Sequence, residues 1–207
     1  MKKQTVIFDL GGVLVDWNPR YLYRKILDSE AEIDFFLTHI ATSDWNEAQD
    51  AGRSLVDGTN ILLEKHPDPK WKEPILAFYN RWPEMLGGAI MGTVNILKRC
   101  VDDPNLSVYA LTNWSAETWP IALKEFDFLY WFEGVLVSGE EGMRKPAPEF
   151  YQLMMDRYSI DKSAAIFIDD NQRNVDASNA FGLTAVLFKD ASQLDKDLQD
   201  LNILDQG

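Results

Sequence analysis

Five short runs of apolar residues divide the chain, and each has the length of a β-strand. They are "VIFDL" from Val6, "VYALT" from Val108, "GVLVSG" from Gly134, "AIFIDD" from Ala165 and "TAVLF" from Thr184. Because each run is continuously apolar, both faces of every strand should be covered, as in a parallel sheet. The pattern therefore predicts five buried strands of one parallel sheet.

Helical patterns separate the later strand candidates. Residues 148–158 ("PEFYQLMMDRY") and 171–181 have the length of helices and lie between consecutive apolar runs. Strands that alternate with helices are typical of an α/β fold in which helices cover both faces of the sheet. We therefore expect a doubly wound α/β core.

The interval between the first two strand candidates has a different character. From residue 16 to 86 there is no convincing strand, but Asn18 and Ser29 are typical N-cap residues, and Gly52 and Gly58 are predicted helix ends. A helical block of about seventy residues is far longer than a crossover between parallel strands requires. We therefore expect an inserted α-helical cap domain.

The predicted domain boundaries follow from this insertion. The α/β core domain should consist of residues 1–16 and 88–207, and the helical cap domain of residues 17–87. Hinges between the two are expected near residues 15–18 and 87–92, where the second segment is rich in glycine.

Composition narrows the class of protein. The chain has 207 residues, of which 46% are hydrophobic, which is enough for a packed core. A net charge of -13 argues against nucleic-acid binding, because such proteins usually gather Lys and Arg on one face. The single cysteine, Cys100, excludes an intrachain disulfide and a cysteine-based zinc cluster. The sequence shows no secretion signal and no long uncharged apolar stretch. We expect a cytoplasmic protein that binds neither nucleic acid nor membrane.

Polar side chains stand at the ends of three of the five strand candidates. These side chains are Asp9, Thr112, Asn113, Asp169 and Asp170. Ligands of open α/β sheets bind at the carboxyl ends of the strands, so these groups should meet if their strands are neighbours. Lys145, in the loop after the third strand candidate, should enter at the same edge.

Three converging carboxylates predict a cation between them. Without one they would repel each other, and the pKa of at least one would rise steeply. A site with oxygen ligands and few carboxylates suits Mg²⁺, which leaves room for a substrate phosphate. Lys145 would add a second positive charge, while the Thr112 hydroxyl and nearby backbone N–H groups such as that of Gly12 would bind phosphoryl oxygens.

Four segments of the chain resemble the motifs of a known family. In order and spacing, "DLGGVL", "LTN", "RKPAP" and "IDDN" are similar to the four motifs of the haloacid dehalogenase-like superfamily, and together they span nearly the whole chain. The helical insertion looks like that family's C1 cap, and within the family the chain is most similar to the glucose-1-phosphate phosphatase-like branch. The resemblance implies a Rossmann-like core with a helical cap, in a monomer or homodimer.

The resemblance also implies an activity and a role for each motif residue. It implies an Mg²⁺-dependent phosphatase that acts on a small phosphorylated metabolite, such as a hexose 1-phosphate, through an aspartyl-phosphate. Asp9 would be the nucleophile, Lys145 would steady Asp9 and the phosphate, and Trp114 would line the site beside Thr112 and Asn113, which bind the phosphoryl group. Mg²⁺ would be held by Asp9, the carbonyl of Gly11, Asp170 and Asp169, the last directly or through water.

Gly11 departs from the family pattern. Most phosphatases of the family carry a second Asp two residues after the nucleophile, which protonates the leaving group and then activates water. Loss of such a group typically lowers the rate ~10² to 10⁴-fold, so turnover should be slow or confined to good leaving groups unless Asp16 or a cap residue replaces it. Cap residues that could face the site are Trp45, Asn46, Asp50 and Arg53.

Three other functions compete with this interpretation. A metal-independent 2-haloacid dehalogenase would use the same aspartate, but adjacent Asp169 and Asp170 favour Mg²⁺ and phosphate. A phosphomutase would suffer especially from Gly11. A catalytically weak member that binds a phosphorylated metabolite or a partner protein is the third, and the presence of Asp9 and Lys145 argues against it.

Overall fold

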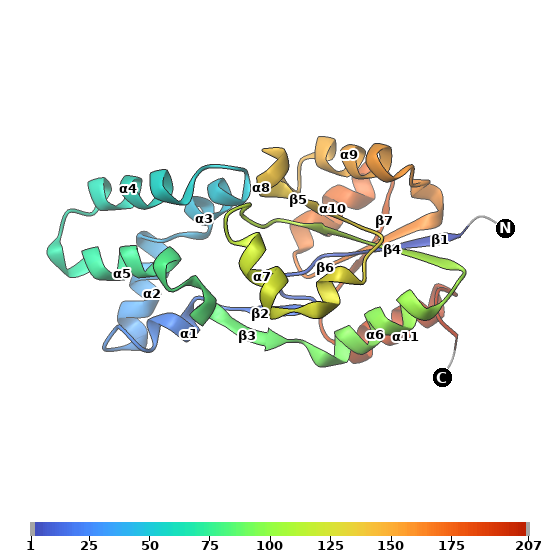
Figure 1. The fold of residues 1–207 in the computed structure, drawn as a ribbon, viewed down its shortest axis with the longest axis horizontal. Coiled ribbons are helices and arrows are strands. Elements are labelled where there is room, and N and C mark those ends of the chain that lie inside the picture. Colours follow the sequence, from blue (N-terminus) through green and yellow to red (C-terminus); the bar gives the residue numbers. More distant parts are fainter. Residues whose placement is uncertain (1–2, 206–207) are drawn as a thin grey trace.

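The computed structural model describes residues 3–205, and its centre is a five-stranded sheet (Figure 1). Every neighbouring pair of strands is parallel, and the strand order is β5-β4-β1-β6-β7. The strands are β1 (Gln4–Phe8), β4 (Leu106–Thr112), β5 (Gly134–Val137), β6 (Ala165–Asp169) and β7 (Thr184–Leu187). The five predicted strands and the doubly wound α/β class are confirmed.

Helices cover both faces of this sheet (Figure 1). One face carries α6 (Met91–Asp102) and α11 (Ala191–Asp200), and the other carries α9 (Pro148–Tyr158) and α10 (Gln172–Phe181). Alternate side chains of β1 enter opposite cores: Val6 and Phe8 pack in the cluster that contains Leu97, whereas Ile7 packs with Phe150. The shorter elements of this region are α7 (Trp119–Glu125), η2 (Asp127–Tyr130), α8 (Ser138–Glu141) and η3 (Lys162–Ala164).

Five helices lie at the other end of the molecule, and we call residues 20–80 the helical insert (Figure 1). They are α1 (Arg20–Tyr23), α2 (Glu30–His39), α3 (Ser43–Asp50), α4 (Leu55–Lys65) and α5 (Pro69–Asn80). The predicted cap at Ser29 is present, since its hydroxyl accepts from the backbone N–H of Glu32. The division into separate core and cap domains stays a prediction.

The two segments expected to be hinges pair with each other. After a short η1 (Trp82–Met85), β3 (Leu86–Ala89) forms an antiparallel ribbon with β2 (Val15–Trp17). The hydrophobic pattern of the sequence does not predict this ribbon, because its strands are short and one of them has the sequence "LGGA". The chain therefore enters and leaves the insert along one two-stranded ribbon.

Gly58 does not end a helix, and this prediction was wrong. It lies inside α4, where a Cβ atom would stand 2.7 Å from the side-chain amide carbon of Gln49 on α3. Gly58 is present because α3 and α4 approach closely. Gly52, with a φ of +97°, does follow the end of α3, as predicted.

Replacing Gly58 should therefore destabilise the insert. We expect Gly58→Ala to lower the free energy of unfolding by about 1–2 kcal/mol, because overpacking outweighs the gain in helix propensity. Gln49 is 1% exposed and has little room to move. Urea unfolding measures the change, and Asn60→Ala on an exposed position of α4 is the control. Equal stability of the two variants would contradict the close approach.

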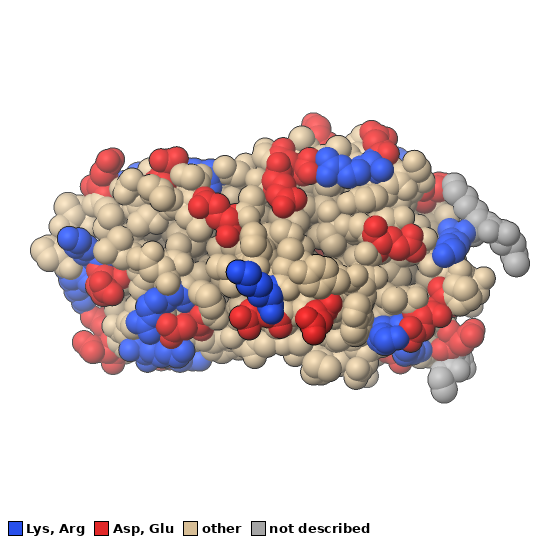
Figure 2. All heavy atoms as spheres, in the orientation of Figure 1, with Lys and Arg blue, Asp and Glu red and all other residues tan. Residues whose placement is uncertain are grey.

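The outer surface carries charges of both signs. On the face shown in Figure 2, lysine and arginine side chains are interspersed with aspartate and glutamate. Within residues 3–205, no helix combines the length and the apolar character that a membrane span requires.

Candidate active site

Asp9 stands at the carboxyl end of the central strand. Its backbone N–H donates to the carbonyl of Ile168 at 2.8 Å, which ties the end of β1 to β6. One carboxylate oxygen, Oδ1, accepts from the backbone N–H of Leu10 at 2.7 Å. The residue is 7% exposed, so the carboxyl group is held in place but remains within reach of a substrate.

The structure brings three of the predicted acidic residues together. Asp9, Asp169 and Asp170 each offer a carboxylate oxygen, and these atoms lie within 4.8 Å of one another. The fully buried Lys145 reaches the same point: its Nζ is 2.9 Å from Asp9 Oδ1 and 2.7 Å from Asp169 Oδ2, and it donates to the carbonyl of Leu111. One ammonium group therefore faces three carboxylates.

The pKa directions reflect this imbalance. Burial raises the pKa of Asp9 well above its usual range, and the charges of Asp169 and Asp170 raise it further, while Lys145 lowers it. Burial and the charge of Asp169 also raise the pKa of Asp170. Burial lowers the pKa of Lys145, but Asp169 and Asp9 hold it above its ordinary value. The cluster carries more negative charge than Lys145 neutralises.

A divalent cation fits this set of donors. Asp169 accepts from Lys145, from the backbone N–H of Asn171 and, with both oxygens, from the Asn174 amide, so its main contacts are within the protein. The carboxylate of Asp170 is more exposed and close to Gly12, where a Cβ would stand 2.2 Å from Asp170 Oδ2. Gly12, with a φ of +76°, leaves the space in which Asp170 approaches Asp9.

Thr112 offers an unsatisfied hydroxyl next to the carboxylates. Its Oγ1 is buried at the end of β4 and has no hydrogen-bond partner within residues 3–205. Buried polar groups are nearly always paired, so an unpaired one at a ligand site points to a partner supplied by the ligand. The position agrees with the predicted phosphoryl contact.

Two other predicted phosphoryl contacts are occupied within the protein. The side chain of Asn113 brackets the backbone of Lys145: its Nδ2 donates to the Lys145 carbonyl at 3.0 Å, and its Oδ1 accepts from the Lys145 N–H at 2.9 Å. The backbone N–H of Gly12 donates to the carbonyl of Val15 at 2.9 Å. Asn113 thus fixes the backbone at Lys145, and Gly12 provides space; the phosphate contacts predicted for these two residues stay predictions.

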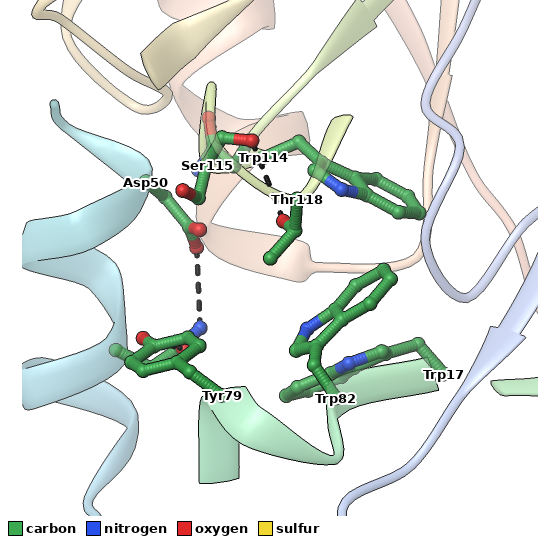
Figure 3. Close-up of a pocket in the computed structure, with 9 residues that line it drawn as sticks. Trp17, Asp50, Tyr79, Trp82, Trp114, Ser115 and Thr118 are labelled. Atoms are coloured by element: carbon green, nitrogen blue, oxygen red, sulfur yellow. Dashed lines mark hydrogen bonds between the residues drawn. The ribbon is translucent and has the colours of Figure 1, made fainter. Parts of the chain in front are cut away.

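A cavity of about 130 Å³ opens between the insert and the core (Figure 3). Its wall consists of Trp17, Asn46, Asp50, Tyr79, Trp82, Asn113, Trp114, Ser115 and Thr118. Trp114 is part of this wall, and so are two of the four insert residues named as facing the site, Asn46 and Asp50, while their contact with a substrate stays a prediction. Trp45 instead donates its indole N–H to the carbonyl of Gly58, and Arg53 binds Gln49 and the carbonyl of Trp45.

Direct contacts hold the insert against the core. Glu47 on α3 forms ion pairs with Arg144, which precedes Lys145 in the chain, and with Arg173 on α10 at 2.8 Å. The hydroxyl of Ser138 donates to the backbone carbonyl of Asp50 at 2.5 Å. The structure therefore has the insert closed over the carboxyl end of the sheet.

Sequence reasoning missed two residues that shape the site. Ser138 directly follows the strand of the third apolar run, "GVLVSG", and the rule that selected polar strand ends would have found it. Asn174 lies in the first turn of α10, five residues after Asp169, and helix geometry alone gives no sign that its amide turns back to that carboxylate.

Comparison with known proteins assigns the family. The family model of the haloacid dehalogenase-like hydrolases matches residues 3–182. The chain therefore belongs to the haloacid dehalogenase-like hydrolase family, as its four motifs indicated. Along 96% of both chains it is 28% identical to the sesquiterpene phosphatase astK of Aspergillus oryzae. Membership of this family and a phosphatase relative support the expected phosphoric monoester hydrolase.

Solved structures with the same fold include both kinds of chemistry. A family enzyme from Bacteroides thetaiotaomicron, in complex with magnesium and inorganic phosphate, has a TM-score of 0.66 at 21% identity, over 91% of this chain and 95% of that one. The L-2-haloacid dehalogenase from Xanthobacter autotrophicus, with chloropropionic acid covalently bound, has a TM-score of 0.64 at 15% identity. This match covers 98% of this chain and 84% of that one. The fold alone does not distinguish a phosphatase from a dehalogenase.

Proposed function

We propose that this chain is an Mg²⁺-dependent phosphatase that hydrolyses a small phosphomonoester through an aspartyl-phosphate on Asp9. The observation that carries the proposal is the convergence of Asp9, Asp169 and Asp170 around the single ammonium of Lys145. A dehalogenase that attacks carbon has no need for two further carboxylates beside its nucleophile, because they repel the anionic haloacid. A cation and a phosphoryl group explain them.

Each residue then has a defined task. Asp9, the carbonyl of Gly11 and Asp170 would hold Mg²⁺, with Asp169 beside them, and the bound ion would neutralise carboxylate charge and draw electron density from the phosphoryl oxygens. Lys145 lies 2.9 Å from Asp9 Oδ1, so it orients the nucleophile and stabilises charge on the phosphoryl group. The unpaired hydroxyl of Thr112 donates to a phosphoryl oxygen.

The cavity supports a leaving group with an apolar surface. Three indole rings, those of Trp17, Trp82 and Trp114, form one side of it (Figure 3). Aromatic faces bury apolar carbon well. The likeness to a sesquiterpene phosphatase agrees with an isoprenoid alcohol, whereas the polar side chains of Ser115 and Thr118 would also accept the hydroxyl groups of a hexose phosphate.

A panel of phosphate esters tests the proposal. Farnesyl phosphate, glucose 1-phosphate, glucose 6-phosphate and para-nitrophenyl phosphate are each incubated with Mg²⁺ or with EDTA, and released phosphate is measured. We expect release that requires Mg²⁺, with farnesyl phosphate ahead of the sugar phosphates. Folded protein that binds Mg²⁺ but releases no phosphate would instead support the binding protein, and metal-independent halide release from 2-chloropropionate would support the dehalogenase.

A further inference from the structure

The site lacks an acid–base group two residues after Asp9, the proposed nucleophile, because Gly11 occupies that position. Hydrolysis of an alkyl phosphate requires a proton on the departing oxygen and removal of a proton from the attacking water. Gly11 supplies neither, although a Cβ at this position would meet no atom within 4 Å. Packing therefore leaves room for a side chain that the sequence does not provide.

Two acidic residues near the insert are already engaged. Asp16 on β2, one of the predicted substitutes, accepts from the Tyr21 hydroxyl at 2.7 Å and is not part of the cavity wall. Glu47 is paired with Arg144 and Arg173. Neither carboxylate is placed to exchange a proton with a substrate in the cavity.

Asp50 is the acidic residue of the cavity wall. It is the last residue of α3, and Figure 3 shows its carboxyl group beside Ser115, opposite the three indole rings. Asp50 shares this wall with Asn113, which brackets the Lys145 backbone. Through Asn113, which follows Thr112 in the chain, the wall that carries Asp50 adjoins the residues of the predicted phosphoryl site.

A chain of hydrogen bonds fixes Asp50 relative to the phosphoryl site. The backbone N–H of Trp114, two residues after Thr112, donates to Ser138 Oγ at 2.9 Å, and Ser138 donates to the carbonyl of Asp50 at 2.5 Å. Gly52, two residues after Asp50, packs against the backbone of Gly139: a Cβ atom on Gly52 would stand 3.4 Å from the Gly139 carbonyl oxygen. The end of α3 is thereby fastened to the strand ends of the core.

A second set of hydrogen bonds orients the carboxyl group. Asn46 Nδ2 donates to Asp50 Oδ2 at 3.3 Å, while the hydroxyl of Tyr79 donates to Asn46 Oδ1 at 3.0 Å. Gln49 Nε2 donates in turn to the Tyr79 oxygen at 2.8 Å. Because Tyr79 takes the oxygen end of the Asn46 amide, the nitrogen end faces Asp50.

We propose that Asp50, supplied by the insert, is the acid–base residue that replaces the missing group at Gly11. The inference rests on the proposed phosphatase function. In the first step Asp9 attacks phosphorus, the bond from phosphorus to the ester oxygen breaks, and the Asp50 carboxyl group gives its proton to that oxygen. In the second step the Asp50 carboxylate takes a proton from water as the water oxygen bonds to phosphorus. The bond to Asp9 then breaks, and phosphate leaves.

The charges around Asp50 agree with such a role. The pKa of Asp50 is raised to about 7: burial and the charge of Glu47 raise it, while Arg144, the backbone N–H of Ser115 and Lys145 lower it. A group that titrates near neutral pH can both donate and accept a proton there. Tyr79 is connected to Asp50 through Asn46, and the charges of Asp50, Arg53 and Glu117 act in turn on the pKa of Tyr79.

The test compares a poor and a good leaving group. The values of kcat/KM for n-hexyl phosphate and para-nitrophenyl phosphate are measured with Mg²⁺ in wild type, in Asp50→Asn and in Asp44→Asn, a control on an exposed position of the same helix. We expect Asp50→Asn to lose ~10² to 10⁴-fold with the hexyl ester and far less with the aryl ester, whose leaving group departs without a proton. In wild type, kcat/KM for the hexyl ester should fall as pH rises through about 7, because the acid must be protonated, and this decline should be absent in Asp50→Asn.

A rescue variant separates catalysis from a structural effect. Gly11 has no positive φ and has free space around it, so Gly11→Asp can place a carboxyl group beside the nucleophile. In the Asp50→Asn background it should restore activity on the hexyl ester. Equal losses on both esters, no rescue, or a wild type that cleaves only the aryl ester would overturn the role of Asp50 while the phosphatase function stands. A wild type that cleaves neither ester would overturn both.

Discussion

Asp9→Asn should abolish phosphate release while leaving the fold intact. The amide is a poor nucleophile, so the covalent route is lost, and we expect the rate to fall by ~10³-fold or more. The amide has nearly the same shape, and its oxygen can still accept from the backbone N–H of Leu10, as Asp9 Oδ1 does at 2.7 Å. Phosphate release and circular dichroism measure the two effects.

Asp16→Asn is the matched control for this variant. Asp16 lies in the same N-terminal segment, but its carboxylate binds the Tyr21 hydroxyl away from the carboxylate cluster. We expect it to keep activity within a few-fold of wild type, as is usual for a residue outside the reacting groups. Comparable losses in both variants would mean that the segment, and not the nucleophile, had been damaged.

Lys145→Met should abolish activity and also destabilise the protein. The side chain is fully buried and paired with both Asp9 and Asp169, so its removal leaves two carboxylates without their partner. Breaking a buried ion pair in this way typically costs about 3–5 kcal/mol. Urea unfolding in EDTA measures the loss, and Lys124→Met on the exposed side of α7 is the control.

The destabilisation in Lys145→Met should depend on pH. Burial already raises the pKa of Asp9, and removal of the lysine charge raises it further. A carboxyl group whose folded-state pKa lies above its unfolded value contributes stability that is complete below the unfolded pKa and is lost as pH rises through the folded pKa. The deficit relative to wild type should therefore be larger at pH 8 than at pH 5. A deficit that does not change with pH would contradict the role of Lys145 as the counter-charge.

The parallel sheet and its strand ends could be predicted because local sequence determines them. Five continuously apolar runs mark strands buried on both faces, and the polar residues that follow three of them share one edge of a parallel sheet. The pattern therefore predicts that Asp9 and Asp169 lie together, and their carboxylate oxygens do converge. The prediction depended on these strands being neighbours, and β1 does pair with both β4 and β6.

The parts that sequence did not predict depend on contacts between distant segments. The ribbon of β2 and β3 joins residues about seventy positions apart, and its glycine-rich strand has little intrinsic strand character. A glycine in a helical pattern predicts a helix end, but Gly58 is explained by the close approach of α3 to α4, which is a tertiary contact. The choice of Asp50 among the polar residues of the insert likewise depends on how Ser138 fastens α3 to the core.

Trapping the phosphorylated enzyme tests the central claim most directly. Wild type is mixed with para-nitrophenyl phosphate and Mg²⁺, quenched in acid within the first turnover, digested and mapped by mass spectrometry. We predict a phosphoryl group on the peptide that contains Asp9, absent with EDTA and absent in Asp9→Asn. A phosphoryl group on a different residue, or undiminished phosphate release by Asp9→Asn, would contradict the account.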